Sequence, residues 1–226
     1  MTTPPPGSTL PEELLLLALD PLRGKPYCRG RSLEYAMAGA ALAELELQGR
    51  ITAQRDRIQV VNPLEPPDPV LAALMRSLPG PGKGRSGVPA EGWVRRAGQP
   101  AGGMYLEAAV QSGVLLRETR RFLGLVPHHR HPAGPQSYAV HVRERFAAAE
   151  PAGLPDHRSR APAALVSAAG LDPHVAGGGR PSRSAMRSLV QERWPAHAVY
   201  RNVRRDAPDR SGRRAGQAGM SSGSDS

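Results

Sequence analysis

The chain has 226 residues, of which 39% are hydrophobic, so it is long enough to bury a substantial core. Aromatic residues make up only 4%, so leucine, valine and alanine must supply most of the packing, which favours helices. Lysine and arginine exceed aspartate and glutamate by ten, almost entirely through arginine. This excess reflects either the bias of a GC-rich genome or a polyanionic partner, such as nucleic acid or an anionic membrane surface.

Cysteine usage and the N-terminal sequence indicate a cytosolic protein. Cys28 is the only cysteine, which excludes an internal disulfide and a cysteine-built zinc site. The first residues lack the basic start of a signal peptide, and the apolar run Leu14 to Leu19 is too short to span a bilayer. Residues 1–8 are expected to be disordered.

The first half of the chain predicts two helices followed by a hairpin. Thr9 and Glu12 have the spacing of a capping box, which predicts a buried apolar helix over residues 10–20. Residues 33–51 keep helical spacing, and Gly49 suits the left-handed end of that helix. One side would carry Met37, Ala41, Leu42 and Leu45, and the other Glu34, Glu44 and Gln48. Segments 50–53 and 57–61 are rich in β-branched residues and predict two paired strands.

Proline and glycine then divide the chain. Flexible loops are predicted near residues 62–69 and 79–103, with a short helix over 70–78 between them. A helix over 104–112 is predicted to end at Gly113 and to lead into a second hairpin, with strands 114–117 and 122–126 joined across 118–121. Three helices follow at 138–149, with Val140, Val142 and Phe146 as the expected apolar members, and at 161–171 and 182–194. The polar residues 206–226 are predicted to form a disordered tail.

No motif predicts an enzyme, a cofactor or a metal. The run from Gly80 to Ser86 lacks the spacing of a phosphate-binding loop. His128, His129 and His131 could ligate a metal, but they are interpreted as part of a solvated, proline-bounded loop over 128–135. Cys28 has arginine neighbours that could lower its thiol pKa, although the sequence places no histidine nearby to act as a base.

The second hairpin combines cations with apolar residues. Arg117, Arg120 and Arg121 precede the apolar residues Phe122, Leu123, Leu125 and Val126. Such a pattern suits phosphate groups at one level of a membrane and hydrocarbon just beyond. The alternative is a hairpin whose apolar side packs on the core while its arginines are solvated.

Three segments in the same order resemble the Golgi phosphoprotein family. They are Leu10 to Leu17, Gly39 to Ile51, and Gly113 to Leu115 followed by Arg121 to Leu125. The family comprises Golgi effectors of phosphatidylinositol 4-phosphate and their bacterial relatives, and the resemblance extends over roughly Leu10 to Arg205. It implies a mainly α single domain over 9–205, with a protruding β-hairpin, a second short hairpin and disordered termini. It also implies a non-enzymatic peripheral membrane protein.

The resemblance also indicates where a lipid headgroup would bind. Eukaryotic members use a tryptophan and three basic residues, and these positions match Arg29, Ala38, Gln99 and Gly102 here. Candidate headgroup residues are therefore Arg29, Arg31, Arg117, Arg120 and Arg121, while Phe122, Leu123, Leu125 and Val126 are candidates for membrane insertion or self-association.

The functional prediction is a cytoplasmic adaptor that associates peripherally with membranes. Its expected partner is phosphatidylinositol 4-phosphate or a bacterial anionic lipid, with no cofactor. The alternative is a winged-helix-like nucleic-acid-binding protein, since a helix followed by a basic hairpin is also the plan of such domains. A third possibility is a family member that has lost its ligand.

Overall fold

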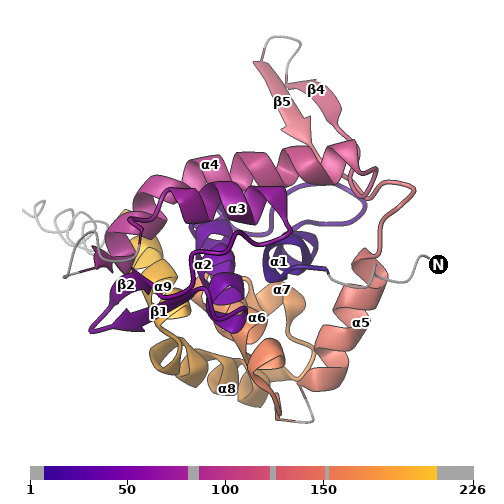
Figure 1. The fold of residues 1–226 in the computed structure, drawn as a ribbon. Helices are drawn as coiled ribbons and strands as arrows, with labels where there is room; N and C mark the ends of the chain where they lie inside the picture. The colour runs from indigo at the N-terminus through magenta and orange to yellow at the C-terminus, as the bar shows by residue number, and fades with distance from the viewer. Residues whose placement is uncertain (1–7, 81–86, 123–125, 151–152, 208–226) are drawn as a thin grey trace, which may run out of the picture.

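The computed structural model describes residues 8–80, 87–122, 126–150 and 153–207, and this part of the chain is mainly α-helical, as predicted. The helices are α1 (Leu10–Ala18), α2 (Ser32–Leu47), α3 (Pro69–Arg76), α4 (Ala90–Gln111), α5 (Ala139–Ala149), α6 (His157–Ala168), α7 (Asp172–Val175), α8 (Gly179–Glu192) and α9 (Trp194–Asp206). The strands are β1 (Ile51–Gln54), β2 (Arg57–Val60), β3 (Val88–Pro89), β4 (Glu118–Phe122) and β5 (Val126–Arg130). Figure 1 shows the helices packed around α2, with α4 across the top and the β4–β5 hairpin standing clear of them.

Helix α1 begins with the predicted capping box. The Thr9 backbone N–H donates to the Glu12 carboxylate over 2.8 Å, which satisfies one of the N–H groups left without a partner at a helix start. Leu14 to Leu17 are all buried, because the helix packs against α2, α4, α5 and α6. The prediction of a short helix that is apolar on all sides is confirmed.

Helix α2 lies at the centre of the molecule and has no solvent-facing side over Tyr35 to Leu45, where every residue is buried. It packs against α1, α4, α6 and α9. The predicted polar side is therefore wrong at Glu44, which is 4% exposed. Its carboxylate accepts hydrogen bonds from the Leu10 backbone N–H and the Gln48 side chain, each over 2.9 Å. These bonds make burial of the charge tolerable and join the start of α1 to α2.

The long helix α4 corrects the prediction of a flexible loop over 79–103. Residues 90–103 belong to α4, which continues through Pro100 to Gln111, and residues 88–89 form the strand β3 on the edge of the β1–β2 pair. The absence of a side chain at Gly98 lets α4 approach α2 closely. A Cβ at this position would lie 3.2 Å from the Glu34 backbone of α2. The close approach of the two helices outweighs the weak helix propensity of the segment.

The first predicted hairpin is confirmed, and the second is displaced along the sequence. Strands β1 and β2 pair Ile51 with Val60. Strands β4 and β5 pair Glu118 with Arg130 and Phe122 with Val126, so residues 118–121 form a strand and not the predicted turn. His128 and His129 consequently belong to β5, which corrects the predicted loop at 128–135.

Helix α5 matches the predicted segment 138–149 closely, whereas α6 and α8 each begin and end a few residues before the predicted 161–171 and 182–194, and α9 is a helix that was not predicted. Val140 was expected in the core but is 52% exposed, whereas Val142 and Phe146 are buried. The predicted disordered ends lie mostly outside the described residues, but Ser8 is buried and Asp206 completes α9.

Replacing Glu44 by alanine should destabilise the fold. Without the Glu44 carboxylate, the Leu10 backbone N–H would have no acceptor. The positive charge of Arg158, whose guanidinium lies 3.6 Å from Glu44, would also lose a nearby negative charge. We expect the free energy of unfolding to fall by about 2 kcal/mol or more, measured by urea denaturation.

The matched control is Glu65→Ala. Glu65 pairs with Arg76 at 2.9 Å, but both side chains are more than half exposed, so its loss should cost about 0.5 kcal/mol or less. Equal stabilities for the two variants would contradict the structural role given to Glu44.

Candidate functional site

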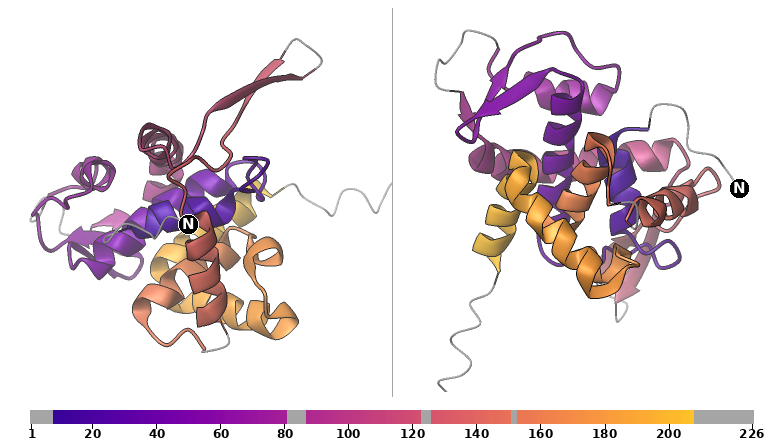
Figure 2. Two further views of the ribbon diagram at one scale, coloured as in Figure 1. Left: turned by 90° about the vertical axis from the view of Figure 1, so that its right-hand side faces the viewer. Right: turned by 90° about the horizontal axis from the view of Figure 1, so that it is seen from below.

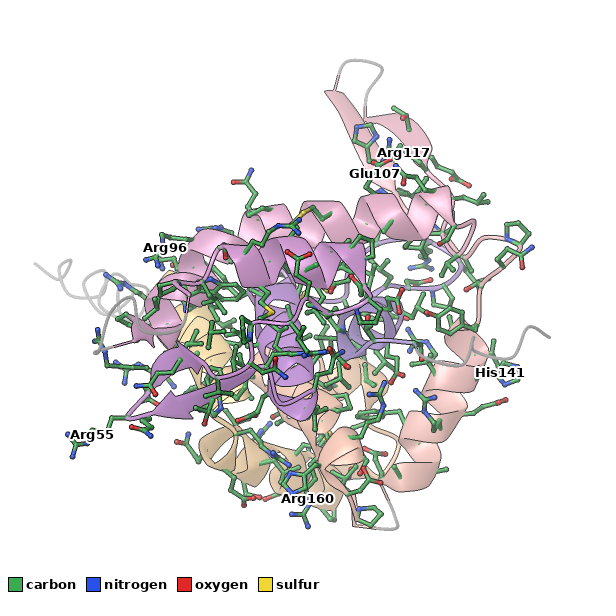
Figure 3. The ribbon with its side chains drawn as sticks, in the orientation of Figure 1. Arg55, Arg96, Glu107, Arg117, His141 and Arg160 are labelled. Atoms are coloured by element: carbon green, nitrogen blue, oxygen red, sulfur yellow. The ribbon has the colours of Figure 1, made fainter. Side chains whose placement is uncertain are left out.

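The β4–β5 hairpin rises from the end of α4 and away from the helical body (Figures 1 and 2). Arg117 stands immediately before β4, and its guanidinium pairs with the carboxylate of Glu107 on α4, at the foot of the hairpin in Figure 3. The same hydrogen bond from Arg117 holds the pKa of Glu107 below its usual value. Arg117 therefore anchors the hairpin to α4 while its side chain remains 45% exposed.

The other predicted hairpin residues lie farther out. Arg120, Arg121, Phe122 and Val126 belong to the paired strands, whereas Leu123 and Leu125 lie outside the described residues. A strand advances about 3.3 Å per residue, so the end of β4 lies roughly 13 Å beyond its start. Among the described residues of the hairpin, the paired Phe122 and Val126 therefore lie farthest along it from Arg117.

Arg31 and Arg29 differ in what surrounds them. Arg31 pairs with Glu34 at 2.8 Å, donates to the Arg95 carbonyl over 3.3 Å and lies over the Tyr35 ring at 4.9 Å from its centroid. Protein groups therefore occupy much of its hydrogen-bonding capacity. The side chain of Arg29 is exposed and has neither a hydrogen bond nor an ion pair with any other described residue.

The predicted arginines do not converge on one pocket. Arg31 contacts Arg95 in the first half of α4, and Arg117 contacts Glu107 near its end. Twelve residues of helix correspond to about 18 Å. Figure 3 shows the same separation between Arg96 at one end of α4 and the Glu107–Arg117 pair at the other.

The loop between α1 and α2 touches the foot of the hairpin, which sequence analysis did not predict. The His131 backbone N–H donates to the Gly24 carbonyl and the Ala133 N–H donates to the Pro21 carbonyl, each over 2.9 Å. The sequence does predict a turn-rich connection over residues 20–30, because Asp20, Pro21 and Gly24 are residue types typical of turns. Its partner is more than one hundred positions away, and no local pattern indicates that.

A cavity of about 270 Å³ lies between α1, α5 and α6. Its walls are largely apolar, with Leu17, Val142 and Phe146 among them. Glu13, one of the lining residues, is buried and pairs with Arg145 at 2.6 Å and with Arg158 at 3.5 Å. Asp156 also lines the cavity, so the two carboxylates and two guanidinium groups of the lining sum to no formal charge.

The comparison with protein families identifies the chain. A family model described as Golgi phosphoprotein 3 (GPP34) matches residues 10–205. The chain belongs to the Golgi phosphoprotein 3 family. No curated protein gives a significant match to the chain. None of the helices in the described ranges is long and apolar enough to cross a membrane.

In this member of the Golgi phosphoprotein 3 family, the positions matched to the headgroup pocket do not form a cationic site. Ala38 and Gly102 are buried where α2 meets α4, and Gln99 is exposed. Arg29 is the only cation among the four matched positions, and the neighbouring Arg31 and Arg95 are paired with Glu34 and Asp206.

Asp206 supplies one of these carboxylates and forms a closed network with its neighbours. It accepts hydrogen bonds from Arg95 over 3.1 Å and from the Tyr35 hydroxyl over 2.5 Å. The hydrogen bond from Tyr35 is the main reason why the pKa of Asp206 is lowered, so the carboxylate stays ionised. The Asp206 carboxylate of the chain itself is therefore the anion that faces Arg31 and Arg95.

The histidines and Cys28 were the remaining candidates for reactive side chains. Among the described residues, no three histidine, cysteine, aspartate or glutamate side chains are grouped to hold a metal. Burial and the nearby charges of Arg117 and His129 lower the pKa of His131. Burial raises the pKa of the Cys28 thiol to about 11, contrary to the lowering predicted from its arginine neighbours.

Cys28 should therefore react slowly with thiol reagents in the native protein. The thiolate is the reactive form, and a pKa of about 11 leaves very little of it at pH 8. Ellman's reagent should label the native protein much more slowly than the protein unfolded in urea. Equal rates at pH 8 would contradict the buried, protonated thiol.

Proposed function

We propose that the protein is a non-enzymatic peripheral membrane adaptor that binds anionic phospholipids through the side carrying the β4–β5 hairpin. The observation that carries this proposal is the hairpin itself, which extends away from the body and is anchored at its foot by the Arg117–Glu107 pair. In its sequence, the cations Arg117, Arg120 and Arg121 precede a run of apolar residues that extends to Val126. Membership of the Golgi phosphoprotein 3 family supports the same adaptor function.

The charge of the chain favours general anionic lipids over one specific headgroup. The formal net charge is +10, and each basic residue close to an anionic bilayer contributes about 1 kcal/mol of attraction. Of the four positions matched to the phosphatidylinositol 4-phosphate pocket, three hold Ala38, Gln99 and Gly102, which provide no cation, and only Arg29 is charged. A bacterial anionic lipid such as phosphatidylglycerol suits this surface, and the protein would then act at the cytoplasmic face of a membrane.

The structure gives little support to the nucleic-acid alternative. In a winged-helix domain the helix before the hairpin enters the major groove, but every residue of α2 from Tyr35 to Leu45 is buried. The other helix followed by a hairpin is α4, whose exposed positions include Gln99, Glu107 and Gln111 beside one arginine, Arg96. This surface would provide few phosphate contacts.

The chain should sediment with phosphatidylglycerol vesicles at low salt and not with phosphatidylcholine vesicles. Binding should weaken as salt is raised, because exposed charges are screened over about 10 Å at 0.1 M ionic strength. Replacing Phe122 and Leu123 together by serine should abolish most of the binding at any salt concentration, since their apolar contribution does not depend on screening. Failure of the wild-type chain to sediment, or unchanged binding of this variant, would contradict the proposal.

The contribution of charge can be isolated with two double variants of equal charge. Arg120→Gln with Arg121→Gln should weaken vesicle binding by about 2 kcal/mol, roughly thirtyfold. The control is Arg55→Gln with Arg180→Gln, in which Arg55 lies at the tip of the β1–β2 hairpin on the far side of the molecule (Figure 3). Equal loss in both variants would show that only net charge matters. Tighter binding to random duplex DNA than to vesicles at the same ionic strength would favour the nucleic-acid alternative.

A further inference from the structure

Leu22 is the most exposed large apolar side chain in the described part of the chain. It is 88% exposed, compared with 67% for Leu64 and 55% for Val61. It lies in the turn that follows α1, between Pro21 and Arg23. A single exposed leucine is common in proteins and carries no meaning alone, so its surroundings decide its role.

The turn holds Leu22 in a fixed position. One oxygen of the Asp20 carboxylate accepts hydrogen bonds from the backbone N–H groups of Leu22, over 2.9 Å, and of Arg23, over 2.8 Å. The Gly24 N–H donates to the Asp20 carbonyl over 2.7 Å, and the Asp20 N–H donates to the Lys25 carbonyl over 2.9 Å. These bonds order the turn in advance, so a partner that meets Leu22 loses little additional entropy by fixing it.

Gly24 attaches this turn to the foot of the hairpin. Its φ is +62°, and a Cβ at this position would collide with the backbone of His131 and Pro132. Only glycine allows such a contact, which the hydrogen bond from His131 to the Gly24 carbonyl completes. The segment His131 to Pro132 also contacts the residues just before β4. The Leu116 N–H donates to the Pro132 carbonyl over 2.9 Å, and Leu116 is 45% exposed. Leu22 and Leu116 therefore flank the base of the projection.

The turn and the hairpin lie on the same side of the molecule. In Figure 1 the indigo loop between α1 and α2 passes behind α4 towards the foot of the hairpin, and in the left view of Figure 2 the hairpin rises above it. The segment between β2 and α3, which contains Leu64, lies on the opposite side of that view.

Leu22 is followed in the sequence by exposed cations. Arg23, Lys25 and Arg29 are exposed. The carboxylate of Asp20 is the only acidic group from residue 20 to 31, and it is engaged in the turn. A rigidly held apolar side chain among cations matches the interface of an anionic bilayer, where headgroup phosphates lie just above hydrocarbon.

We propose that the turn Asp20 to Lys25 is a second membrane-contact element, with Leu22 entering the interface of an anionic bilayer while Arg23 and Lys25 bind headgroup phosphates. This inference rests on the proposed function and adds to it a contact that the hairpin does not include. A hairpin alone leaves the body free to tilt about its point of insertion. The second contact restricts that tilt and turns the α1–α2 loop towards the membrane.

The test compares Leu22→Ser with Leu64→Ser, its matched control, on vesicles of phosphatidylglycerol and phosphatidylcholine. Both leucines are exposed, so both variants should unfold at the wild-type temperature, as circular dichroism can verify. Leu22→Ser should bind about tenfold more weakly, because it loses the transfer of one leucine side chain from water. Leu64→Ser should bind as the wild type does.

The outcomes separate this inference from the proposed function. If the wild-type chain does not bind vesicles, both are wrong. If the wild type binds and Leu22→Ser binds equally well, the second contact alone is wrong, and the exposed leucine serves another purpose.

A second measurement places the side chain directly. In Leu22→Trp, vesicles should shift the tryptophan emission to shorter wavelength, and brominated lipid should quench it. Leu64→Trp should show neither change, and the two native tryptophans, the buried Trp93 and the partly buried Trp194, are the same in both variants. An unchanged spectrum for Leu22→Trp on vesicles that bind the protein would overturn the inference.

Discussion

Complete burial of α2 is the constraint on which the rest of the structure depends. From Tyr35 to Leu45 the helix has no exposed residue, and many of its side chains are alanine. Small side chains let α1, α4, α6 and α9 approach from all sides. At Gly39 the approach is so close that a Cβ would overlap the side chains of Val199 and Leu165. Because α2 fixes α4, it also fixes where the β4–β5 hairpin leaves the body.

The proposed membrane side follows from this arrangement. The loop that leads into α2 and the segment that follows β5 meet at Gly24 and His131, so two distant parts of the sequence form one surface. Arg117 and Glu107 secure the same region to α4. Meanwhile Arg31 and Arg95 are paired with Glu34 and Asp206, whereas Arg23, Lys25 and Arg29 on the loop are exposed. The charge available to a lipid is thus distributed along a surface and not concentrated in a pocket.

Local sequence signals predicted local structure well, and packing decided the rest. The capping box of α1 and the left-handed Gly49 after α2 were recognisable because each depends on neighbouring residues. The continuation of α4 through Pro100 was missed because contact with α2 outweighs helix propensity. The solvent side assigned to Glu44 was wrong because its partners come from α1 and α6. Among the site residues, Arg29, Arg31 and Arg117 were named from sequence, but only the folded chain shows which are already paired and that Leu22 stands beside the hairpin.

Hydrogen exchange on phosphatidylglycerol vesicles tests the membrane side most directly, because it reports on every segment of the unmodified protein at once. The account predicts slower exchange of backbone amides in residues 20–31 and 115–131 when vesicles are present. It predicts no change in the β1–β2 hairpin or in α8, which face away from that side. Protection of β1–β2 or α8, with residues 20–31 and 115–131 unchanged, would contradict the account.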